Sequence, residues 1–277
     1  CATDSSTSVL TFTKAVSWPG KTLRVNAYGD VRFEAPLVLG SLTVGYNSAL
    51  GGDITLLSKQ NQIANISLNR ANIVAGDDFV LSGAAFSVSR GFSSETRSAL
   101  DLNGKNQVLA SLQYDSGSAK NYYGEKSVYV RSSTPATLFL KGASTSRTSY
   151  QTLSGKVSLV VDAADYPSFT QTFAGRAHTT TGTLSVSNGT LAVALGATFK
   201  KVGEIHVGPS GNLTVDASTA LSGMFTGATN VIVDGRMTIG ANITNPFTDE
   251  TVDLSLGENG ELSLPDAMVL RVKSLTI

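Results

Sequence analysis

The sequence has one cysteine, Cys1, among 277 residues, so no disulfide bond can form within the chain. Two interpretations of Cys1 stay open. It can carry a lipid anchor, with the polar residues 2–7 as a tether, or it can be an exposed thiol that pairs between chains.

Charged residues are also scarce, at 15%, and 21 basic residues balance 21 acidic ones. Nucleic-acid-binding proteins draw most of their affinity from a basic surface, so this balance argues against a nucleic-acid partner. Long apolar runs are missing, because no stretch reaches the roughly 18 residues of a membrane-spanning helix. Hydrophobic residues still make up 41%, which is enough to bury a core.

Histidine is limited to His178 and His206. Neither has a second histidine or a cysteine close by in the sequence, so we expect no zinc site. The Thr-rich surroundings of His178 predict a loop. His206 stands between Ile205 and Val207 and should face outward from a strand.

An acidic cluster near the C-terminus leaves one metal interpretation open. Four carboxylates within ten residues can bind calcium, but solvated loop residues are the simpler interpretation of Asp249, Glu250, Asp253 and Glu258. No phosphate-binding loop or dinucleotide fingerprint is present. We therefore expect no cofactor and no resident metal.

Period-two alternation of apolar and small polar residues, interrupted by glycine, is abundant. Residues two apart in a strand point to the same side, so each alternating segment predicts a short strand with one buried face. The recurrent form is Gly-x-Leu-x-Val, in which glycine permits the positive φ of a tight corner. It occupies residues 40–44, 182–186, 189–193 and 211–215, with a close variant over residues 260–264.

Short strands separated by corners favour an all-β fold. We predict a right-handed parallel β-helix whose turns of about 20–25 residues, on the order of a dozen in all, stack on a shared core. The alternative is an antiparallel β-sandwich or barrel. Four hairpin-type dipeptides support that alternative: Asn103-Gly104, Asn188-Gly189, Asp234-Gly235 and Asn259-Gly260. The repetition of Gly-x-Leu-x-Val favours the β-helix.

The domain organisation follows from the same patterns. We predict an N-terminal tether and cap over residues 1–20, in which Trp18 shields the first turn, and a solenoid over residues 21–277. Polar segments near residues 112–126, 143–152 and 165–181 are predicted to project from the stack as loops. Residues 270–277 predict strand to the last residue, and a free strand edge invites pairing. We expect a longer native chain or a neighbouring chain at this open edge.

Residues 165–199 combine a polar, Thr-rich segment with GTLSV at residues 182–186 and NGTLAV at residues 188–193. This order resembles the autotransporter-associated β-strand repeat, and the similarity covers residues 136–264, with looser agreement before them. The resemblance implies a surface or secreted bacterial passenger, usually a right-handed β-helix.

Enzyme motifs are weak. Gly76–Asp78 resembles the paired-aspartate element of polygalacturonases, whose acid and base are carboxylates, and Arg271–Lys273 resembles their basic element. The Gly-His-Gly element between them is absent, and the two pieces are too far apart for neighbouring turns. A turn that leads into a strand over residues 79–81 is the preferred interpretation of the aspartates. We expect no enzymatic activity, with a polysaccharide lyase or hydrolase as the alternative.

Three tyrosines are the best binding candidates, because sugars stack on exposed aromatic rings and form hydrogen bonds with polar neighbours. The candidate glycan site comprises Tyr114, Tyr122, Tyr123, Asp115, Asn121 and Glu125. The alternative is that these rings fold back and cover core edges.

The expected function is that of an adhesin or structural rod, extracellular or on the outer surface of a bacterium. Its expected partners are glycans, host or cell-envelope components and neighbouring chains. The alternatives are a glycan-binding surface lipoprotein and the polysaccharide-active enzyme.

Overall fold

The computed structural model describes residues 9–26, 29–45, 52–69, 71–81, 83–90, 98–114, 128–217, 221–248, 250–266 and 268–277. These residues form strands and turns, with no helix among them, and hence no helix that could cross a membrane. Parallel strands stack as a β-solenoid of about 10 turns. The chain divides into two compact units, Cys1–Leu138 and Phe139–Ile277.

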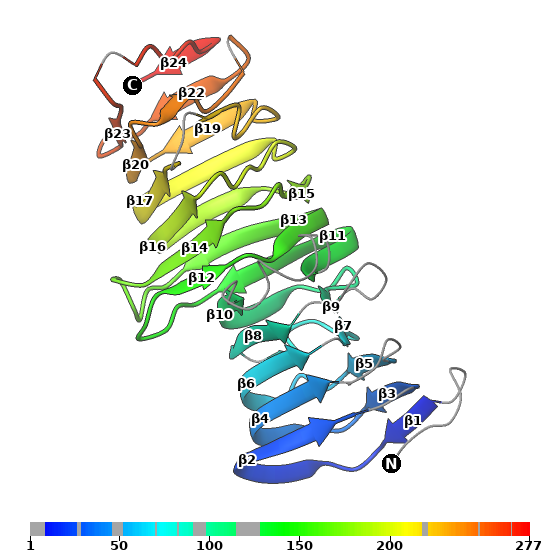
Figure 1. Ribbon diagram of the computed structural model, residues 1–277. Helices are drawn as coiled ribbons and strands as arrows, with labels where there is room; N and C mark the ends of the chain where they lie inside the picture. Colours follow the sequence, from blue (N-terminus) through cyan, green and yellow to red (C-terminus); the bar gives the residue numbers. More distant parts are fainter. Residues whose placement is uncertain are drawn as a thin grey trace. The chain divides into compact units, whose positions relative to one another are not determined.

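The first unit contains two stacks of parallel strands (Figure 1). One stack consists of β1 (Val9–Phe12), β3 (Asp30–Phe33), β5 (Asp53–Leu56), β7 (Asn72–Ala75), β9 (Ser98–Asp101) and the beginning of β11 (Val128–Leu140). The other consists of β2 (Val16–Val25), β4 (Leu37–Gly45), β6 (Gln62–Asn69), β8 (Ala84–Arg90) and β10 (Gln107–Tyr114). Alternate residues of these strands point inward, and the leucine, isoleucine, valine and phenylalanine side chains among them form the core.

A glycine corner divides each of the strands β2 and β4 into two straight segments. Gly20 has a φ of 72°, in the left-handed region. At Gly40, one turn later, an added Cβ would lie 2.5 Å from the carbonyl carbon of Gly20. The strand β2 therefore has a segment before the corner, Val16–Trp18, and a segment after it, Thr22–Val25, and both pair with β4.

Two buried amides join successive turns of this unit. The side chain of Asn61 accepts a hydrogen bond from the backbone N–H of Leu37 at 2.8 Å and donates one to the carbonyl of Val80 at 3.0 Å. Gln107 accepts from the backbone N–H of Leu81 at 3.2 Å and donates to the carbonyl of Asp77 at 2.8 Å. Such amides satisfy backbone groups where the chain leaves one strand and has not yet begun the next.

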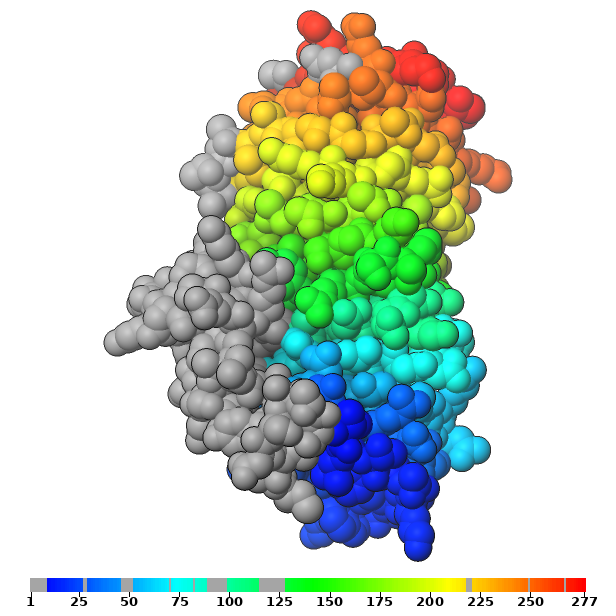
Figure 2. Space-filling model, turned by 90° about the vertical axis from the view of Figure 1, so that its right-hand side faces the viewer, coloured from blue at the N-terminus to red at the C-terminus, as the bar shows by residue number. Residues whose placement is uncertain are grey.

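The second unit repeats the parallel arrangement, and Figure 2 shows its residues as bands of colour in chain order from green to red. Its strands after β11 are β12 (Arg147–Ser149), β13 (Thr152–Asp162), β14 (Thr170–Ala174), β15 (Thr179–Thr180), β16 (Leu184–Ala194), β17 (Glu204–Val215), β18 (Leu221–Ser222), β19 (Asn230–Val233), β20 (Arg236–Ile239), β21 (Ile243–Asn245), β22 (Asp253–Leu256), β23 (Glu261–Ser263) and β24 (Ser274–Thr276).

The two adjacent Gly-x-Leu-x-Val motifs form the two halves of β16. Leu184, before the corner, pairs with Ile205, and Leu191, after it, pairs with Leu213. Gly189 adopts a φ of 81° at the corner itself. Every described strand pairing is parallel, so the antiparallel sandwich or barrel is wrong. The Asn-Gly dipeptide at this position makes a corner in one strand, where the alternative required a hairpin.

Three segments differ from their expected structure. Residues 143–152 and 165–181 were expected to project as loops, but they contain β12, β14 and β15, which pair with neighbouring strands of the stack. Polar residues can form these strands because their outward positions face solvent and their inward ones are satisfied by hydrogen bonds. Residues 9–20 belong to β1 and β2 of the first turn, and do not form a separate cap. The right-handed winding stays a prediction.

A buried aromatic stack runs through the second unit. The ring of His178 lies 4.0 Å from that of Phe199, with an interplanar angle of 11°. Phe199 stacks in turn on Phe225 at 6.2 Å, and Phe225 contacts Phe247 at 6.0 Å. Each ring belongs to a later turn than the one before it, so the stack links the turns through the core.

Candidate functional site

The candidate glycan site is described at only one of its residues. Tyr114 is the last residue of β10, pairs with Val88, and is 3% exposed. Its ring is therefore part of the buried surface and offers no open stacking face, which corrects the expectation for this residue. The other members, Asp115, Asn121, Tyr122, Tyr123 and Glu125, lie outside the described residues, as does Cys1.

The aspartate pair at Asp77 and Asp78 stabilises a turn. A carboxylate oxygen of Asp77 accepts a hydrogen bond from the backbone N–H of Asp78 at 2.7 Å, and Lys59 lies 3.3 Å from the same oxygen. That backbone hydrogen bond, aided by Lys59, lowers the pKa of Asp77. Asp78 accepts from the backbone N–H of Asn106 at 2.6 Å. The expected strand over residues 79–81 is wrong, because these residues continue the turn.

The basic element Arg271–Lys273 lies in the second unit, at its last turn. The ammonium group of Lys273 is 2.9 Å from a carboxylate oxygen of Asp253, and the Ser274 hydroxyl donates to the other oxygen at 2.6 Å. The hydrogen bonds from Ser274 and Lys273 lower the pKa of Asp253. The aspartate pair and the basic element are therefore each engaged in contacts between neighbouring turns.

The acidic cluster forms no metal centre among its described members. Glu250, Asp253 and Glu258 are described and Asp249 is not, and within the described part of the chain no three His, Cys, Asp or Glu side chains converge. Asp253 is already engaged by Lys273 and Ser274.

The two histidines have opposite surroundings. His206 faces outward, as expected, and its Nε2 lies 3.1 Å from a carboxylate oxygen of Asp234. Ser185 is its in-register neighbour on β16. This row resembles a nucleophile, a base and an acid in order, but it lies on an outward face, and none of its three residues lines either of the cavities described below.

His178 was expected in a loop and is instead in the core, where it is 2% exposed. Its Nδ1 accepts a hydrogen bond from the backbone N–H of Leu153 at 3.0 Å, so the proton of the neutral ring is on Nε2. Burial, with a smaller contribution from the positive charge of Arg176, lowers the pKa of His178 to about 3.

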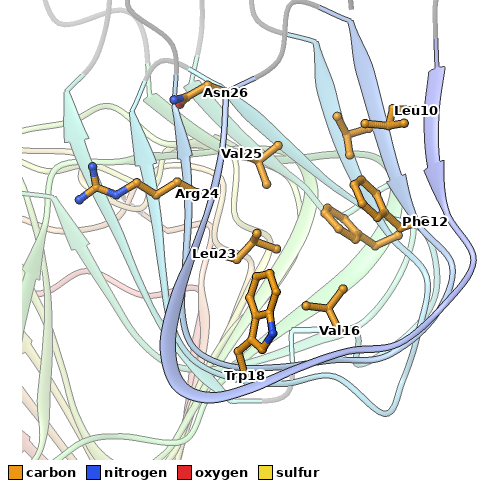
Figure 3. A pocket seen from close by; sticks show the side chains of 10 residues that line it. Leu10, Phe12, Val16, Trp18, Leu23, Arg24, Val25 and Asn26 are labelled. Carbon is orange, nitrogen blue, oxygen red and sulfur yellow. The ribbon is translucent and has the colours of Figure 1, made fainter. Parts of the chain in front are cut away.

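An apolar cavity of about 360 Å³ opens at the first turn of the first unit (Figure 3). Inward-pointing side chains of β1, β2 and β3 line it, together with Arg24 and Asn26 at its edge. The rings of Phe12 and Phe33 stack at 4.8 Å within this lining. Trp18 is 52% exposed, whereas Leu39, its pairing partner one turn later, is 4% exposed. The cavity thus lies at the first described turn, whose inward residues pack on the next turn.

Arg24 is the one charged residue that lines this cavity. Residues 9–26 carry Lys14, Lys21 and Arg24 and no carboxylate. The guanidinium group of Arg24 extends away from the apolar space (Figure 3). Sequence reasoning placed Trp18 in a cap. The apolar alternation in residues 9–25 was the signal that these residues form strands of the solenoid instead.

A second, shallow depression of about 360 Å³ lies at the glycine corners of the second unit. It is polar, and its lining consists of Pro209, Ser210, Gly211, Asn212, Gly235, Arg236, Asn259 and Glu261. Arg236 and Glu261 are paired within it at 2.7 Å, so its principal charges already neutralise each other.

Comparisons of the chain with protein-family models, with curated proteins and with solved structures found no match.

Proposed function

We propose that this chain is a non-enzymatic bacterial β-solenoid, either on the cell surface or secreted, and that it acts as an adhesin or structural rod. The observation that carries the proposal is that charged side chains form ion pairs between neighbouring turns in both units. These pairs are Arg131 with Asp101, Lys141 with Asp162, Arg236 with Glu261, and Lys273 with Asp253.

Asp162 illustrates this use. It binds Lys141 on one neighbouring strand segment and accepts a hydrogen bond from the Asn188 side chain at 2.6 Å on the other. These contacts lower its pKa, with Lys141 as the larger cause. A carboxylate held in its charged form by two partners serves the stacking of turns, as a structural rod requires.

The resemblance of residues 136–264 to the autotransporter-associated β-strand repeat supports the same proposal. Its core motif, over residues 182–193, forms the two faces of β16 and the corner between them. Repeats of this kind build length by adding turns, and their broad faces suit adhesion.

The proposal is tested with the purified chain and a panel of polysaccharides. We expect no release of reducing sugar and no formation of unsaturated uronide, and we expect beads coated with the folded chain to adhere to bacterial or host cell surfaces. Beads coated with heat-denatured chain are the control. Sugar release that disappears in Asp77→Asn or Asp78→Asn would establish the enzyme instead. Adherence that one soluble glycan abolishes would favour the glycan-binding lipoprotein.

A further inference from the structure

One corner of the first unit presents an aromatic ring to solvent. Phe79 lies in the turn between β7 and β8 and is 45% exposed, whereas the next two residues, Val80 and Leu81, are fully buried. The adjoining corners, residues 57–61 and 102–106, contain no exposed large hydrophobic residue. A protein interface needs a broader apolar centre than one ring, so the size of this feature matches a small ligand.

The backbone at Phe79 is strained. Its φ is 57°, in the left-handed region that bulky side chains rarely adopt. The corners on either side impose this conformation: the N–H of Phe79 donates to the carbonyl of Asn106 at 2.8 Å, and the carbonyl of Val80 accepts from the Asn61 side chain at 3.0 Å. Such strain lowers stability and is typical of binding sites, where a fixed backbone positions a side chain before the ligand arrives.

Hydrogen-bonding groups lie around this turn. Lys59 is exposed on the corner one turn earlier and contacts Oδ1 of Asp77 at 3.3 Å. Lys105 lies on the corner one turn later, and its charge lowers the pKa of Asp77 after the larger effects of the Asp78 backbone and Lys59. Oδ2 of Asp77 takes part in neither the hydrogen bond from Asp78 nor the contact with Lys59. The turn therefore combines an aromatic ring with a carboxylate oxygen that can accept and an ammonium group that can donate.

We propose that Phe79 is a stacking platform for a neutral glycan, and that the turn holds it there at a cost in stability. The ligand class is a chain of β-1,4-linked glucose or N-acetylglucosamine, because the ring hydrogens of these sugars are axial and give each ring an apolar face that stacks on Phe79. Asp77 accepts hydrogen bonds from sugar hydroxyls, and Lys59 donates to them. Two lysines and two aspartates balance at this site, so the ligand needs no charge.

This inference deepens the proposed adhesin role and rests on it, because it names a ligand class for the surface. It is tested by saturation-transfer difference nuclear magnetic resonance of the full chain with cellohexaose and with chitohexaose. We expect saturation of the aromatic protons to pass to the sugar, and mainly to the axial hydrogens of one ring face, because only one face stacks on the platform.

Two substitutions of Phe79 separate binding from folding. Phe79→Asn removes the ring and suits the left-handed backbone, since asparagine adopts positive φ more readily than phenylalanine. It should raise the melting temperature and lower the affinity for the hexasaccharides at least about 10-fold. Phe79→Tyr keeps the ring and should bind as the unchanged chain does. A ring that served only to stabilise the fold would give the opposite change in melting temperature for Phe79→Asn.

The matched control is Leu195→Asn in the second unit. Leu195 has a φ of 50° and is 51% exposed, but it has no aromatic ring. Its replacement should also raise the melting temperature and should leave sugar binding unchanged. An unchanged chain that binds neither hexasaccharide, a Phe79→Asn variant that binds as well as the unchanged chain, or one that melts at a lower temperature would each overturn the proposal. Beads that still adhere to cells in that event would leave the adhesin role intact, whereas beads of the unchanged chain that do not adhere would contradict that role itself.

Discussion

We expect His178 to make the second unit sensitive to mild acid. Its pKa is about 3 in the folded chain and 6.5 when the ring is exposed to water, so the unfolded state binds the proton more strongly. The stability that the neutral buried ring contributes is complete above pH 6.5. It is lost as the pH falls from there towards 3, at about 1.4 kcal/mol per pH unit. Between pH 7 and pH 5 the loss is about 2 kcal/mol.

Hydrogen exchange of the full chain, followed peptide by peptide, measures this loss. The opening free energy of peptides around Leu153, His178 and Phe199 should fall by about 2 kcal/mol between pH 7 and pH 5, after correction for intrinsic exchange. His178→Phe keeps a ring on Phe199 and removes the titrating group. It leaves the N–H of Leu153 without its acceptor, a cost of about 1–3 kcal/mol that does not vary with pH.

The variant should therefore be less stable at pH 7 but show a nearly flat profile between pH 7 and pH 5. His206→Gln, which replaces the outward-facing histidine, should keep the slope of the unchanged chain. The reasoning is refuted if His178→Phe retains the full slope, or if the imidazole signal of His178 titrates near pH 6.5 in nuclear magnetic resonance spectra.

Three further substitutions test how the turns are held together. Phe199→Ala should destabilise the second unit by about 3–5 kcal/mol, because it empties the middle of the aromatic stack, while hydrogen exchange in the first unit stays unchanged. Gly211→Ala places a Cβ 1.9 Å from the carbonyl oxygen of Val186 and should lower the melting temperature of this unit. The control Gly203→Ala meets no atom within 4 Å and should leave the melting temperature unchanged or raise it slightly. Equal effects of the two substitutions would contradict the close approach of the backbone at the glycine corners. Asn61→Leu removes the amide that bridges Leu37 and Val80 and should cost about 2–4 kcal/mol in the first unit by chemical unfolding, so a neutral result would show that another group satisfies those backbone atoms.

The sequence predicted the strands correctly wherever apolar and polar residues alternate. Residues 182–193 show why: Leu184, Val186, Leu191 and Val193 are all buried, as the period of two requires. It missed β12, β14 and β15, because their inward positions include Ser149, Gln171 and Thr180, which are polar yet fully buried. A polar residue in the core is stable only when its hydrogen bonds are satisfied. Gln171 and Thr180 find acceptors in other turns, at the carbonyls of Arg147 and of Gly155 and Val157.

The candidate sites were less accessible to sequence reasoning than the strands. Tyr114 is buried, and the exposure of a tyrosine depends on what packs beside it. Asp77 and Asp253 are tied to Lys59 and Lys273, which no local pattern indicates. The apolar character of Trp18 was evident, but its place in the lining of an apolar cavity was not.

The sequence by itself determined that this chain forms short, one-sided strands joined at glycine corners, because local backbone sterics and the alternation of side chains act within a few residues. Only the tertiary structure decided which strand lies on which, since the turns are joined by partners some twenty or more residues apart, as Arg236 and Glu261 are at a separation of 25. It also decided that His178 is buried and neutral, and that the first turn has an open apolar cavity. Burial and contact are properties of the stack, and no single strand contains them.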